Sequence, residues 1–180
     1  MKTFIEIIKA AEENDWCVNP FCTTCGSHEF RDELRKLSED HEKGLIDALS
    51  AASVSALSTS LNWGDAVRVA LGEINDAKDM DKVLKSWLPN LPSNIELADL
   101  VLFYFVKQGA IFAPMSVELL NEWVDACKEL AIMTKNESLL ESLIYTLGGR
   151  IADDQELKKV IEATSIGSRK IQQAIKASTS

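Results

Sequence analysis

The chain has 180 residues, of which 46% are hydrophobic, and a net charge of −9 at pH 7. This length suits one domain, or one domain with a small appendage, and suffices to bury a hydrophobic core without help from disulfides or metals. The negative charge disfavours nucleic acid, because phosphates repel an acidic surface, and fits a basic protein partner. The longest apolar run, residues 100–106, falls far short of a membrane span.

The N-terminal residues do not fit a secretory signal, because Glu6, Glu12 and Glu13 stand where a signal needs an apolar core. Three of the four cysteines fall within residues 17–25, which favours metal ligands in a reducing compartment over a disulfide framework. We therefore expect a cytoplasmic protein with no membrane partner.

Apolar residues recur with a helical period along most of the chain. The first helix covers about 2–14. The second follows Ser27, which can cap it, and carries Phe30, Leu34 and Leu37. Further helices are expected at about 45–61, 63–76, 80–88, 94–107, 116–133, 137–147, 154–164 and 167–177. The segment 97–106 is apolar on nearly every side, which predicts a central, covered helix.

Several helix boundaries carry local signals. Ser93 with Glu96 and Thr134 with Glu137 have the spacing of capping boxes, and Asp153 with Glu156 is a variant. Gly44 marks a bend or break. Residues 45–61 are rich in serine and threonine, as a flexible linker would be, but their 3.6-residue apolar period favours a helix.

No long segment alternates with period two, so we predict an all-α fold: a multi-helix antiparallel bundle or a short HEAT-like helical stack. The capping boxes at Ser93 and Thr134 are separated by about one HEAT or armadillo repeat. We divide the chain into residues 1–44, with the N-terminal helix, a metal-binding loop and the following helix, and a helical body over 45–180.

The metal-binding loop has the spacing C-x4-C-x2-C-x2-H, formed by Cys17, Cys22, Cys25 and His28. Zinc prefers four tetrahedral ligands of thiolate sulfur and imidazole nitrogen, and a C-x2-C pair presents two thiolates from one turn. The loop holds few apolar residues, so metal ligation can supply the order that burial cannot. We predict a structural Zn²⁺ site at these four residues.

Other interpretations of the cysteines remain open. His41 could replace His28 as the fourth ligand. Three protein ligands with an open position would make a catalytic site, and a bare C-x2-C pair could be redox-active. Together with Cys127, which otherwise is a small core residue, the cysteines match a plant-ferredoxin iron–sulfur spacing. Three buried thiols without metal are the remaining alternative.

The sequence contains no nucleotide-binding, zinc-protease or serine-hydrolase motif. We therefore expect a protein that is not an enzyme. It is predicted to be a zinc-stabilised protein-interaction module, and an acidic inhibitor or immunity-type protein that masks a basic partner is one concrete version. The alternative is a metal-dependent redox or hydrolytic protein that uses the Cys17, Cys22 and Cys25 cluster.

Overall fold

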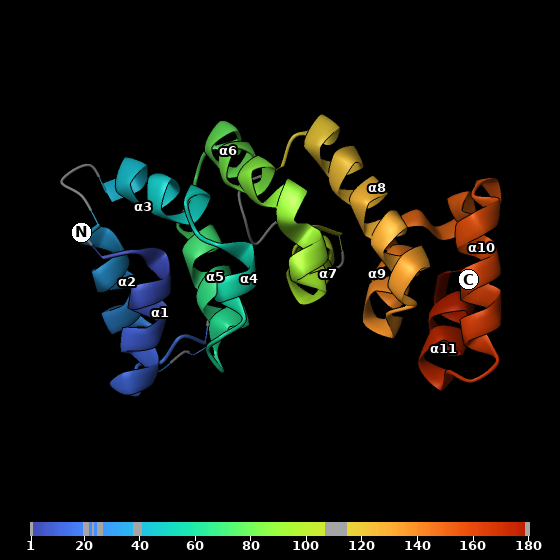
Figure 1. Cartoon of the computed structure of the whole chain (residues 1–180), viewed down its shortest axis with the longest axis horizontal. Helices are drawn as coiled ribbons and strands as arrows, with labels where there is room; N and C mark the ends of the chain where they lie inside the picture. The colour runs from blue at the N-terminus through green and yellow to red at the C-terminus, as the bar shows by residue number, and fades with distance from the viewer. Residues whose placement is uncertain are drawn as a thin grey trace. The chain divides into compact units, whose positions relative to one another are not determined.

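The computed structural model describes residues 2–19, 22, 24, 27–37, 41–106 and 115–178. Every regular element in these ranges is a helix, which confirms the all-α prediction (Figure 1). In chain order the elements are α1 (Phe4–Glu13), α2 (His28–Arg35), α3 (His41–Ser50), α4 (Val54–Leu57), α5 (Trp63–Gly72), α6 (Ala77–Trp87), η1 (Leu88–Ser93), α7 (Ile95–Val106), α8 (Val117–Thr134), α9 (Glu137–Leu147), η2 (Gly148–Asp153), α10 (Gln155–Ser165) and α11 (Arg169–Ser178). None of these helices combines the length and apolar character that crossing a membrane requires.

One predicted helix is wrong. Residues 45–61 do not form a single helix, because α3 passes through Gly44 and ends at Ser50, and only the short α4 follows. The hydroxyls of Ser58 and Thr59 donate to the backbone carbonyls of Ser55 and Ala56, at 3.4 and 2.7 Å. Serine and threonine side chains that bond the local backbone in this way compete with helix continuation. The other predicted helices are present, with bounds shifted by a few residues at most.

Three predicted capping residues, Thr134, Asp153 and Ser93, are also wrong, and Ser93 belongs to η1 with Asn94 between it and α7. The caps of α9 and α10 are Asn136 and Asp154, whose side-chain oxygens each accept a backbone N–H three residues on, at 3.0 Å. Thr134 belongs to α8 and donates to a carbonyl within that helix, and Asp153 precedes the true cap. The hydroxyl of Ser93 donates backward to the carbonyl of Asn90 at 2.7 Å.

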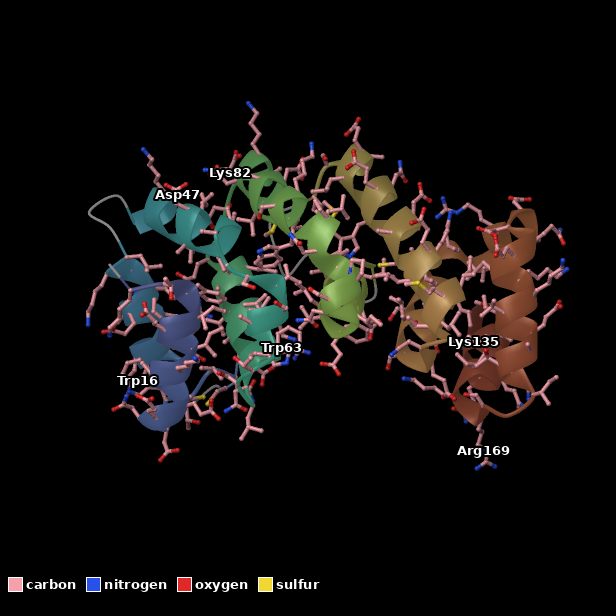
Figure 2. All side chains as sticks on the ribbon, in the orientation of Figure 1. Trp16, Asp47, Trp63, Lys82, Lys135 and Arg169 are labelled. Atoms are coloured by element: carbon pink, nitrogen blue, oxygen red, sulfur yellow. The ribbon has the colours of Figure 1, made fainter. Side chains whose placement is uncertain are left out.

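The helices pack as two compact units. The first runs to Asn94 and takes in a short segment that ends at Ser116. Within it α2 contacts α1, α3 and α5, and α3 contacts α6. The buried indole of Trp87 donates to the carbonyl of Leu49 at 2.9 Å, which ties α6 to α3. An exposed ion pair between Lys82 and Asp47, at 2.8 Å, joins the same two helices (Figure 2).

The second unit begins at Ile95 and continues from Val117 to the last helix. Helix α7 packs against α8 and α9, and α9 packs against α11. Leu97, Ala98 and Val101 of α7 are fully buried, as expected for a central helix. The indole of Trp123 in α8 donates to the carbonyl of Ala98 at 3.1 Å. This bond satisfies the polar atom of a large side chain that is otherwise in apolar surroundings.

The predicted boundary between residues 1–44 and 45–180 falls inside α3, whereas the chain first passes from one compact unit to the other after Asn94. A separate N-terminal segment stays a prediction. The loop that carries the candidate metal ligands lies wholly in the first unit, between α1 and α2.

Candidate metal centre

The loop begins with a sharp end to α1. Asp15 adopts the left-handed conformation with φ 53°. Its N–H donates to the carbonyl of Glu12 at 3.4 Å, and the N–H of Trp16 donates to that of Ala11 at 2.9 Å. These two bonds form a Schellman motif, which satisfies the last carbonyls of the helix. The motif ends α1 at Glu13, and Trp16, the last residue of the motif, directly precedes Cys17.

The neighbours of Cys17 are held against the helices of the first unit. Trp16 and Val18 line one shallow hollow together with Ala11 of α1 and Ala66 of α5. Val18 is buried and Trp16 is partly buried, beside the last turn of α1 (Figure 2). Cys17 therefore stands between two residues whose positions are fixed by packing.

The loop ends at Ser27, which has φ 56° and is fully buried. The prediction that Ser27 caps α2 is wrong, because its side chain forms no capping hydrogen bond. Its hydroxyl instead donates to the carbonyl of Asn19 at 2.9 Å. The N–H of Cys22 donates to the same carbonyl at 3.1 Å. The carbonyl of Asn19 thus links the Cys22 backbone to the residue just before α2.

Helix α2 is held to the rest of the unit by a charged cluster. Arg31 forms an ion pair with Glu73, which follows α5, and Arg35 lies 3.7 Å from the same carboxylate. His28, the first residue of this anchored helix, is exposed. Its imidazole is therefore accessible next to the cysteine loop.

The structure describes three of the four predicted ligands. Cys17 and Cys22 are partly buried, and the Cys22 sulfur lies 3.4 Å from the hydroxyl of Thr24. Cys25 lies outside the described residues, as does the side chain of His41. Among the described residues, no three His, Cys, Asp or Glu side chains are arranged to hold a metal ion. The four-ligand zinc site stays a prediction, although its described donors are of the type that zinc prefers.

Cys127 has a different environment. It is fully buried in α8, with its sulfur 3.8 Å from the carbonyl of Ala98. Burial, and then the nearby charge of Asp99, raise the pKa of the Cys127 thiol far above its ordinary value. The thiolate that a metal or an oxidant needs is disfavoured there. The prediction of a small core residue is confirmed.

A row of exposed acidic residues on α8 was not predicted from the sequence. Glu118, Glu122, Asp125 and Glu129 are all exposed on α8 and are spaced by four, three and four residues. We call these four residues the α8 acidic face, because this spacing puts them on one side of a helix. The signal was present in the sequence, as a charge period inside the predicted helix 116–133.

The rate of reaction with a thiol reagent should distinguish the partly buried Cys17 and Cys22 from the buried Cys127. In metal-free protein at mildly alkaline pH, Cys17 and Cys22 are expected to react with a small thiol reagent faster than Cys127 by about two orders of magnitude. The raised pKa and the burial of Cys127 both reduce its reactivity. Mass spectrometry of labelled peptides measures each rate. In denaturant the rates should converge, and fast native labelling of Cys127 would contradict the assignment.

The described part of the loop contains soft donors of the type that binds metals, and α8 carries a row of exposed carboxylates. No family model matches the chain, and searches of curated proteins and of solved structures returned no match either. Its function must therefore be argued from its own residues.

Proposed function

We propose that the chain is a non-catalytic protein-interaction module, an acidic inhibitor or immunity-type protein that binds a basic protein partner in the cytoplasm. In this proposal the helical body, as an antiparallel bundle or a short HEAT-like stack, presents the docking face. Zinc bound by Cys17, Cys22, Cys25 and His28 fixes the loop between α1 and α2.

The observation that carries the proposal is the α8 acidic face. Asp125 pairs with Lys128 at 2.9 Å, and no other ion pair to this face occurs among the described residues. Val117 and Met133, near the two ends of the same helix, are each 68% exposed. Met133 lies four residues after Glu129 and so continues this face, which places an apolar side chain beside unneutralised carboxylates that a partner could cover.

Electrostatics favours a basic partner for such a face. Like charges spaced by three or four residues on a helix repel one another and destabilise it slightly. A partner that brings lysine or arginine to this surface removes the repulsion and gains charge complementarity. The net charge of −9 would also attract a basic protein over longer distances and raise the association rate.

The zinc part of the proposal rests on the α1–α2 loop. Of the described loop residues, only Val18 and Ser27 are buried. Ordering each residue costs about 1–2 kcal/mol, and so little burial offsets only part of that cost. Coordination by thiolates and imidazole would supply the remainder, as in small zinc-dependent folds.

Metal analysis tests the zinc part. Purified, untagged protein prepared under reducing conditions is expected to contain about one zinc per chain and to show no visible absorption band. Cys22→Ser should lose the metal, whereas Cys127→Ser should keep it. Iron with a visible band would contradict the zinc site and would favour the redox alternative. Metal-free protein from a zinc-replete preparation would refute the site altogether.

Charge reversal tests the docking face. The triple variant Glu118→Lys, Glu122→Lys and Glu129→Lys should bind the basic partner captured by the wild type at least about tenfold more weakly, because three attractive charges become repulsive. Capture at low and high salt, followed by titration of the purified partner, measures the effect.

The matched control is the triple variant Glu13→Lys, Glu156→Lys and Glu162→Lys. It makes the same change in net charge at exposed positions on α1 and α10. The control should retain most of the affinity. Equal loss in both variants would show that only net charge matters, and partners that are all neutral or acidic would contradict the proposal.

A further inference from the structure

Ser27 occupies the cap position of α2 but does not serve as a cap. Serine is among the residues preferred at this position, because its oxygen can accept a backbone N–H from the first turn. Here the side chain makes no such bond, and the residue adopts φ 56° and ψ 34°. A residue with a Cβ is strained in this left-handed region. Both features oppose the stability of α2.

The hydroxyl is used on the cysteine loop instead. It is part of a fully buried residue and donates to the carbonyl of Asn19 at 2.9 Å. That carbonyl also accepts the N–H of Cys22 at 3.1 Å. Through this one acceptor atom, the Cys22 backbone is connected to Ser27, the residue that directly precedes His28.

The two ends of the loop are therefore fixed independently. The Schellman motif at Asp15 and the packing of Trp16 and Val18 fix the Cys17 end. The bond from Ser27 to Asn19 fixes the Cys22 backbone relative to α2, and Arg31 anchors α2 through its ion pair with Glu73. Backbone strain that surrounding contacts maintain is characteristic of functional sites.

We propose that Ser27 is a positioning residue of the metal site, which holds the backbone of Cys22 in place relative to His28 before the metal binds. This inference rests on the zinc site proposed above. Hydrogen bonds that orient ligands without touching the metal typically lower metal affinity about 10–100-fold when they are lost.

Ser27→Gly is the appropriate variant, because glycine adopts positive φ freely and the substitution removes the hydroxyl. Its zinc affinity, measured by competition with a chelating dye, is expected to fall at least about tenfold. The absorption spectrum of the Co²⁺-substituted variant should change, since the coordination geometry is less well held. The amide of Cys22 should exchange with solvent faster than in wild-type protein, with and without zinc.

Ser142→Ala is the matched control. Ser142 is a buried serine in the second unit, and its hydroxyl donates to Asp99 at 2.6 Å. This variant should lower the thermal unfolding midpoint and leave the zinc affinity and the cobalt spectrum unchanged. A purely structural role for Ser27 would give the same pattern in Ser27→Gly: a lower midpoint with unchanged affinity.

The outcomes separate the two proposals. Wild-type protein that takes up no zinc refutes the zinc site, and the positioning role falls with it. Wild-type protein that binds zinc, together with Ser27→Gly that binds it equally tightly, refutes the positioning role alone. The metal-free wild type gives a test that needs no variant, because its Cys22 amide should exchange more slowly than in an unstructured peptide. Exchange at the unstructured rate would overturn the inference.

Discussion

Each helix of this chain depends on burying one apolar face against its neighbours. Every helix except the 18-residue α8 has 12 residues or fewer, and isolated helices shorter than about 12–15 residues are marginal in water. The fully buried Trp87 and Trp123 show how the constraint is met: each adds a large apolar surface to the core, and its indole N–H is satisfied by a carbonyl of a neighbouring helix. Where a segment cannot bury such a surface, its order must come from another interaction.

The loop between α1 and α2 is such a segment. Its described part is held by a helix-terminating turn, by Val18 and Trp16 against the first unit, and by the carbonyl of Asn19. Those contacts fix the ends of the loop and the backbone of Cys22, and the proposed zinc would fix the cysteine side chains between them.

Helix α8 obtains its order by burying one apolar face against its neighbours. One face is buried and the opposite face carries carboxylates, which leaves a surface suited to a basic partner.

Much of the fold follows from periodicity alone. The helix 137–147 was predicted with the bounds that α9 has, because its apolar spacing and its flanking residues agree. The caps were placed wrongly where several side chains compete, since Thr134 and Asn136 are both able to cap and only backbone geometry decides between them. The predicted helix over 45–61 is interrupted after Ser50 and again after Leu57, and at the second interruption the hydroxyls of Ser58 and Thr59 bond the local backbone. Spacing identifies Cys17, Cys22 and His28 as candidate donors but cannot give the path of the loop. Nothing in the sequence, apart from its place before a helix, indicates that Ser27 has a positive φ and bonds the carbonyl of Asn19.

The measurement that tests the central claim most directly is hydrogen exchange along the whole chain, before and after zinc is removed by a chelator. A local structural metal predicts faster exchange in α1, α2 and the loop between them, with unchanged protection in α9, α10 and α11. Uniform loss of protection throughout the chain, or no change in the loop, would contradict the account.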